Sequence, residues 1–248
     1  MHPESPHCQV CDIVSLPDVA LIRMLESVNS NFESTVSMTD FAGDKLYPLE
    51  VTPTRLTTLL KLPKGAFITD AADELKLESW NGLEILVIEG NCDIGGNIHA
   101  TGNYIRLPKT TSKITAATDC LLFVKYNQFL DGDNRQRVID TLADNKWLPG
   151  PVDGIDIRPL HVFDTESIML LRWQHAAEFK PRLNPRGEEI LVVNGLLQNR
   201  DHLYRQYNWI RNPIEDWRTW HGNTGTLAYY KSGHFPDDPI RTSDHHDS

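Results

Sequence analysis

The fold of this chain is decided by a stretch that occurs twice. It reads Gly82-Leu83-Glu84-Ile85-Leu86-Val87-Ile88-Glu89-Gly90 in the first half of the sequence and Gly187-Glu188-Glu189-Ile190-Leu191-Val192-Val193-Asn194-Gly195 in the second, 105 positions later. Each copy is a short apolar run with several β-branched residues between glycines, which is the pattern of a buried β-strand. The repeat therefore predicts two related units built from strands.

Further segments repeat in the same register. Asn103-Tyr104-Ile105-Arg106-Leu107-Pro108 returns as Asn208-Trp209-Ile210-Arg211-Asn212-Pro213, whereas upstream of the first stretch the offset becomes 111. The change of offset indicates extra residues in the first copy, between residues 70 and 81. Because several identities hold a fixed register, the sequence indicates a tandem duplication. Turn residues recur about every ten positions, which favours an all-β jelly roll for each copy.

Composition restricts the class of protein. The chain has 248 residues, is 40% hydrophobic and carries a formal net charge of −10. Such a chain can bury a core, and its acidity argues against a nucleic-acid partner. We find neither a run of about 20 apolar residues that would span a membrane nor a signal peptide at the N-terminus. We therefore expect a cytoplasmic protein with reduced thiols.

Five segments follow one another along the sequence. We expect a leader with one amphipathic helix and a Cys-x2-Cys pair over residues 1–38, a first barrel over 39–130, a connector over 131–146, a second barrel over 147–235 and a disordered tail over 236–248. Within the connector, Arg137-Val138-Ile139 could form a short helix or an edge strand.

The second copy resembles a known family. The run Arg186–Gly195, the later Trp209-Ile210-Arg211-Asn212-Pro213 and the lead-in Trp147-Leu148-Pro149-Gly150-Pro151-Val152-Asp153-Gly154 resemble the ChrR-like branch of the cupins. The resemblance covers residues of about 147 to 235, and more distantly about 39 to 130. It implies a bicupin, with two jelly-roll β-barrels in one chain, and cupins of this kind often form dimers.

The same resemblance implies which residues face a ligand. Cupins of this branch hold a divalent metal through His-x-His-x4-Glu and a later histidine. Here Glu189 matches the acidic ligand, while Arg182 and Asn184 stand at the first two histidine positions and Arg218 at the later one. Since a guanidinium has no lone pair for a metal, we expect this barrel to lack the usual metal site.

The first copy departs from the pattern in the same way. Glu84 matches the acidic position, and Lys113 stands at the later histidine position. A nearby acidic cluster could hold a hard cation or form a solvated loop. Its members are Asp70, Asp73, Glu74 and Glu78.

Two arginines beside one carboxylate allow two interpretations. Arg182, Arg218 and Glu189 would form either a buried ion network or a pocket for a small anion. His221 could add a hydrogen-bond donor to such a pocket or be an ordinary surface histidine.

The N-terminus carries a second candidate site. In His7-Cys8-Gln9-Val10-Cys11, the side chains of His7, Cys8 and Cys11 could bind zinc, or the segment could be a mobile tail with two free thiols.

Three functions remain open from the sequence. The first is a ligand-binding or sensory bicupin that takes a small anion and lacks the usual metal. The second is a metal-dependent cupin enzyme of dioxygenase or isomerase type, and the third is an anti-sigma-like regulatory protein whose leader contacts a partner.

Overall fold

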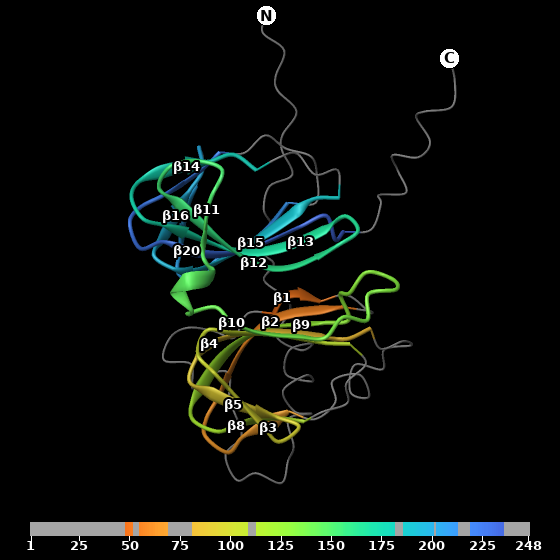
Figure 1. The fold of residues 1–248 in the computed structure, drawn as a ribbon. Coiled ribbons are helices and arrows are strands. Elements are labelled where there is room, and N and C mark those ends of the chain that lie inside the picture. The colour runs from red at the N-terminus through yellow and green to blue at the C-terminus, as the bar shows by residue number, and fades with distance from the viewer. Residues whose placement is uncertain are drawn as a thin grey trace, which may run out of the picture. The chain divides into compact units, whose positions relative to one another are not determined.

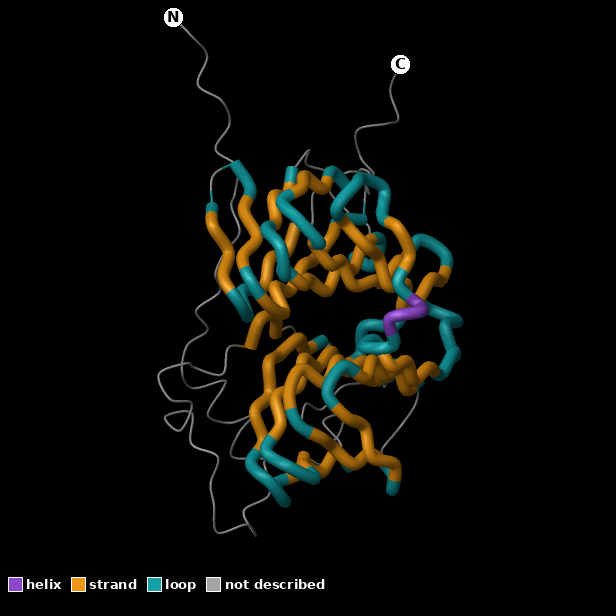
Figure 2. The backbone as a smooth tube through the Cα atoms, turned by 60° about the vertical axis from the view of Figure 1, so that its left-hand side comes forward, coloured by secondary structure: helices purple, strands orange, loops and turns teal. Residues whose placement is uncertain are grey.

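The chain forms two compact units of β-structure. The computed structural model describes residues 48–51, 55–68, 81–108, 113–181, 186–200, 202–212 and 219–235. These residues belong to a first unit, which ends at residue 148, and a second unit, which begins at residue 149 (Figure 1). Among them the only helical element is the short 3-10 turn η2 (Asp144–Lys146), drawn in purple in Figure 2. The all-β prediction is confirmed for the described part.

The first unit contains two antiparallel sheets. A six-stranded sheet has the order β1-β2-β9-β4-β7-β10, and a four-stranded sheet has the order β3-β8-β5-β6. The strands of the larger sheet are β1 (Pro48–Val51), β2 (Leu56–Leu62), β9 (Cys120–Tyr126), β4 (Leu83–Glu89), β7 (Asn103–Leu107) and β10 (Arg137–Asp140). Those of the smaller sheet are β3 (Phe67–Ile68), β8 (Ile114–Ala116), β5 (Asn91–Ile94) and β6 (Asn97–Ala100).

The second unit contains the same two kinds of sheet. Its six-stranded sheet has the order β11-β12-β13-β20-β15-β18, and its four-stranded sheet has the order β14-β19-β16-β17. The larger sheet is made of β11 (Leu148–Pro149), β12 (Ile155–Phe163), β13 (Glu166–Trp173), β20 (Leu227–Ser232), β15 (Glu188–Asn194) and β18 (Trp209–Asn212). The smaller sheet is made of β14 (Ala177–Phe179), β19 (Trp220–Gly222), β16 (Leu196–Gln198) and β17 (Leu203–Arg205).

The strand orders repeat as the sequence does. The run β2-β9-β4-β7 of the first unit corresponds to β13-β20-β15-β18 of the second, and β4 and β15 are the two copies of the repeated stretch. The expected connector also contributes structure, because β10 lies at the edge of the first sheet beside β7. Of the two alternatives for residues 137–139, the edge strand is therefore the one that forms.

A hydrophobic cluster lies between the two sheets of each unit. In the first unit the cluster is mainly aliphatic, and it includes the buried thiols of Cys92 and Cys120. In the second unit it is rich in aromatic side chains. These are Trp173, Phe179, Tyr204, Trp220 and Tyr230. Each large side chain removed from water in this way contributes about 1.5–3 kcal/mol.

The glycine that ends the repeated strand is needed in the first unit. Gly90 follows β4 with a φ of +72°, in the region that L-residues rarely adopt. A Cβ at this position would collide with the backbone carbonyl oxygen of Asp119. The glycine at the end of the repeated stretch is therefore required for a steric reason.

Several expectations lie outside the described residues. They are the leader and its helix, the cysteine pair, the acidic cluster of residues 70–78 and the C-terminal tail. Among the residues that the structure does describe, no helix is long and apolar enough to cross a bilayer.

Candidate functional site

The two repeated glutamates lie on the outer face of their six-stranded sheets. Neighbouring side chains of a strand point to opposite faces. Leu83 and Ile85 belong to the hydrophobic cluster of the first unit, so Glu84 faces away from it. Ile190 belongs to the cluster of the second unit, so Glu189 also faces away. Both glutamates therefore lie on the face of their sheet opposite to the hydrophobic cluster, whereas the resemblance implies an interior position for Glu189.

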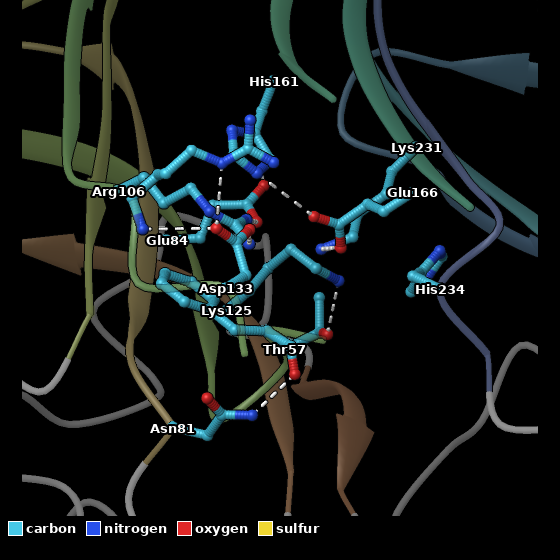
Figure 3. Close-up of polar contacts among 12 residues, drawn as sticks. Thr57, Asn81, Glu84, Arg106, Lys125, Asp133, His161, Glu166, Lys231 and His234 are labelled. Carbon is cyan, nitrogen blue, oxygen red and sulfur yellow. Dashed lines mark hydrogen bonds and ion pairs between the residues drawn. The ribbon is translucent and has the colours of Figure 1, made fainter. Parts of the chain in front are cut away.

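In the first unit Glu84 is the centre of a row of charges that crosses three strands. Arg106 on β7 and Lys125 on β9 stand directly opposite Glu84. The Arg106 guanidinium contacts Oε2 of Glu84 at 3.1 Å and Oδ2 of Asp133 at 2.7 Å (Figure 3). It also stacks over the ring of Phe129 at 3.6 Å. The glutamate, arginine, lysine and aspartate are all buried.

The second unit repeats this row in the same register. Arg211 on β18 and Lys231 on β20 stand opposite Glu189, and the guanidinium of Arg211 lies over the ring of Phe235 at 4.2 Å. Nζ of Lys231 contacts Oε2 of Glu166 at 2.9 Å (Figure 3). Lys231 and Phe235 follow Lys125 and Phe129 by 106 positions, a repeat that sequence analysis overlooked although it was visible.

Each row places a glutamate between an arginine and a lysine, and a further carboxylate contacts one of the two cations. In the first unit that carboxylate is Asp133, which contacts Arg106, and in the second unit it is Glu166, which contacts Lys231. Buried charges are expensive unless they are paired and hydrogen-bonded. The pairing indicates a structural ion network in each unit.

Two histidines of the second unit approach these carboxylates. Nε2 of His161 lies 3.9 Å from Oε1 of Glu166, and Nε2 of His234 lies 3.4 Å from Oε2 of Glu189. All four side chains are fully buried. An imidazole with a carboxylate is the donor combination that zinc, iron and manganese accept, so each pair offers two ligands of that kind. The ammonium of Lys231 already neutralises Glu166.

The acidic side chain that does face the interior is Glu188. The phenol of Tyr230, a member of the hydrophobic cluster, donates a hydrogen bond of 2.7 Å to Oε2 of Glu188. Burial, and next the charge of Glu188, raise the pKa of Tyr230 far above its usual value, so the phenol stays protonated and donates. The ring of Phe179 packs edge-on against Tyr230 at 5.6 Å. In the first unit the equivalent of Glu188 is Leu83.

Glu188 lies where three strands of the second unit end. It stands opposite Asn212, the last residue of β18, and Ser232, the last residue of β20. The segments 182–185 and 213–218 join the chain at β15 and β18 beside this point, and they carry the predicted ligand residues. Arg182, Asn184 and Arg218 themselves lie outside the described residues.

His221 lies apart from the pair of Glu188 and Tyr230, on the outward side of its strand. His221 lies on β19 with its side chain 47% exposed, and its Nδ1 is 3.7 Å from Oε1 of Glu178. Its neighbour Trp220 belongs to the cluster, so His221 faces outward. Of the two interpretations of His221, an ordinary surface histidine is the one that fits this position. His7, Cys8 and Cys11 lie outside the described residues.

Comparison with known proteins agrees with this architecture. The sequence model of the ChrR cupin-like domain family matches residues 135–236. Three solved structures share the fold. They are the cupin 2 conserved barrel domain protein from Leptotrichia buccalis (11% identity, TM-score 0.51, covering 83% of this chain and 98% of that one), quercetin 2,3-dioxygenase from Acinetobacter baumannii (11%, 0.53, 74% and 69%) and salicylate 1,2-dioxygenase from Pseudaminobacter salicylatoxidans (11%, 0.52, 82% and 75%). No curated protein matches the sequence significantly. The chain thus has a cupin fold.

Proposed function

We propose that this protein is a tandem cupin whose second unit binds a small anionic molecule at the strand end around Glu188, in a ligand-binding or sensory role. The observation that carries the proposal is the hydrogen bond of 2.7 Å between Tyr230 and Glu188 inside an otherwise apolar cluster. Packing alone does not call for a carboxylate at this place, because the equivalent position of the first unit holds Leu83.

Charge favours an anion as the ligand. Arg182 follows Phe179 by three residues, and Arg218 precedes Trp220 by two, while Phe179 and Trp220 are direct partners in the pair β14–β19. Both arginines are therefore within three residues, along the sequence, of one pair of facing strand residues. Two guanidiniums and the carboxylate of Glu188 sum to one positive charge, which a monoanion would neutralise, and guanidinium binds carboxylate or phosphate through paired hydrogen bonds.

The experiment compares the arginines with a surface arginine. Isothermal titration of the full chain with lactate, propionate, mandelate, phenylacetate, succinate and inorganic phosphate should show binding of at least one of these anions. The double variant Arg182→Met/Arg218→Met should weaken that binding at least tenfold, because hydrogen bonds between charged groups are lost. Arg205→Met, at an exposed position of β17, should leave it unchanged. Absence of binding by the unmodified protein to every member of the panel would refute the proposal.

A metal-dependent enzyme is the alternative that the two dioxygenases of similar fold suggest. The described donors at this strand end are the carboxylate of Glu188 and the phenol of Tyr230, which do not make the three- or four-ligand set that such metals take. Metal content of the purified protein tests the alternative. A stoichiometric metal that is lost in Glu188→Ala but kept in Glu178→Ala would favour the enzyme over the anion-binding proposal.

Other roles remain predictions. Zinc binding by His7, Cys8 and Cys11 predicts a metal content that falls in the variant Cys8→Ser/Cys11→Ser. Pairing of two copies predicts a dimer in analytical ultracentrifugation, and a regulatory partner of the leader predicts complex formation that a chain lacking residues 1–38 loses.

A further inference from the structure

We propose that the second unit associates with a second copy of this chain through the outer edge of strand β18, so that the two six-stranded sheets join into one. The proposal does not depend on the anion proposed above. It is argued from β18 itself and from the equivalent strand of the first unit.

The equivalent strand of the first unit has a neighbour that β18 lacks in the described part of the chain. Strand β7 lies between β4 and β10, whereas β18 is the last described strand of its sheet. Strand β10 is antiparallel to β7, with Val138 opposite Ile105 and Ile139 opposite Tyr104. The backbone groups along a sheet edge are a template for a further strand. The first unit thus shows that this edge accepts an antiparallel strand.

The hydrogen bonds of β18 show which residues offer their backbone groups at the edge. The amide of Val192 on β15 donates to the carbonyl oxygen of Asn208 at 3.0 Å, just before β18 begins. Residues along an antiparallel strand direct their backbone groups alternately to one side and the other. Ile210 therefore directs its backbone groups to β15, and Trp209 and Arg211 direct theirs to the outer edge of β18.

A two-fold axis at Ile210 makes this edge complementary to itself. When Ile210 lies opposite Ile210 of the second copy, Trp209 of each copy lies opposite Arg211 of the other, and backbone hydrogen bonds form at both positions. Both side chains are half-buried, and both lie on the outer face, since they stand opposite Leu191 and Glu189. A guanidinium is attracted to an indole ring. The pairing is closed and makes the contact twice, as in a two-fold dimer.

Tyr207 favours a short partner strand of this kind. It has a φ of +68°, which a bulky residue rarely adopts, and the equivalent residue of the first unit is Gly102. A Cβ on Gly102 would lie 2.5 Å from Cγ of Leu142, which follows β10. A strand that continued past this turn as the chain does after β10 would therefore meet the side chain of Tyr207. Pairing about Ile210 involves only residues 208–212 and ends before the turn.

The test is the association of the full chain in solution. Because the pairing is short, sedimentation velocity at about 1 to 200 µM should show a reversible equilibrium of monomer and dimer. The salt concentration should be about 0.15 M, which screens the net charge of −10 on each copy. Trp209→Lys places a cation opposite Arg211 twice in each dimer, and Trp209→Glu places an anion there. We expect the lysine variant to associate at least about tenfold more weakly than the glutamate variant.

Two control variants place the same cation on other edge strands. Leu203→Lys lies on β17 and Val138→Lys on β10, where the native side chains are 48% and 52% exposed. Both should associate within about threefold of the unmodified protein, because neither residue lies at the proposed interface. Circular dichroism checks that all four variants fold.

Hydrogen exchange tests the same edge without any variant. In the unmodified protein, the amides of Trp209 and Arg211 should exchange more slowly at 200 µM than at 1 µM, because only the dimer gives them a partner strand. Four results would each overturn the proposal. They are a monomer over the whole concentration range, equal association of the lysine and glutamate variants, loss of association in either control, and exchange that does not depend on concentration.

Discussion

The charged row of the first unit predicts very different effects for two arginines that share one carboxylate. Asp133 is fully buried, and its partner Arg106, at 2.7 Å, is fully buried too. Its other partner, Arg135, at 3.3 Å, has a side chain that is 44% exposed. Replacing Arg106 by Met keeps much of the apolar stem but leaves Glu84 and Asp133 without their shared cation.

The expected loss follows from burial. Removing one partner of a buried ion pair typically costs 3–5 kcal/mol, so we expect Arg106→Met to lower the free energy of unfolding of the first unit by about 4 kcal/mol. Arg135→Met removes an exposed cation, for which about 0–1 kcal/mol is usual. With a urea slope of about 2 kcal/mol per molar for a unit of this size, the midpoints should fall by about 2 M and by less than about 0.5 M.

The cysteines provide an assay that follows the first unit alone. The chain has four cysteines, at positions 8, 11, 92 and 120, so in a Cys8→Ser/Cys11→Ser background the remaining two lie in the core of the first unit. Labelling of these thiols against urea concentration then measures its unfolding. Equal midpoint shifts for Arg106→Met and Arg135→Met would refute the reasoning, since burial would then not determine the worth of the ion pairs. A small shift for both would show that Glu84 and Asp133 do not depend on Arg106.

Three further predictions concern the same unit. In the Cys8→Ser/Cys11→Ser background, a disulfide reagent at pH 8 should label neither remaining thiol of the native protein. Burial raises the pKa of Cys92 to about 12 and that of Cys120 to about 11, so no more than about one thiol in 1,000 is ionised. Because these folded-state pKa values exceed the ordinary thiol pKa of 9.0, the unfolded state loses protons first as pH rises. The free energy of unfolding should therefore fall above about pH 9, and less steeply in Cys92→Ala/Cys120→Ala. Gly90→Ala should lower the free energy of unfolding by more than about 3 kcal/mol, because its Cβ would meet a backbone carbonyl. Gly96→Ala, also at positive φ but in open space, should lower it by about 1 kcal/mol. Similar melting temperatures for the two variants would contradict this reasoning.

The repeat carried most of the fold information in the sequence. Because β4 and β15 are copies of one another, their strand type and their equivalent places in the two sheets could be predicted from the register alone. The edge strand β10 could not be settled in the same way. It is short, with alternate side chains exposed, and a pattern of that length also fits a helix.

The phase of the two adjacent glutamates could not be predicted from the sequence. Strand β15 is buried at every position from Glu188 to Val193, and β4 is buried over its first five positions. A strand buried on both faces has no alternation of apolar and polar residues, and alternation is the signal that assigns a face. The sequence pattern therefore does not distinguish Glu188 from Glu189, although Glu188 faces the hydrophobic cluster and Glu189 lies in the charged row.

The balancing carboxylates were hidden for a different reason. Asp133 follows the last strand of the first repeat, whereas Glu166 begins β13 of the second. They do not occupy equivalent positions, so no repeat signal connects them. Each becomes recognisable only when the fold brings it to a buried cation, Arg106 in one unit and Lys231 in the other.

The two units differ in a way that separates stability from ligand binding. On the outer face of the larger sheet, each unit has a glutamate between an arginine and a lysine, with a phenylalanine ring against the arginine. An arrangement that is the same in both units indicates a structural role. In the interior they differ, because Leu83 and Val124 of the first unit correspond to Glu188 and Tyr230 of the second. A buried carboxylate costs free energy that a leucine does not, even with a hydrogen bond from a neighbour. Stability therefore favours the interior of the first unit, and the polar pair of the second is best explained by the ligand that we propose it contacts.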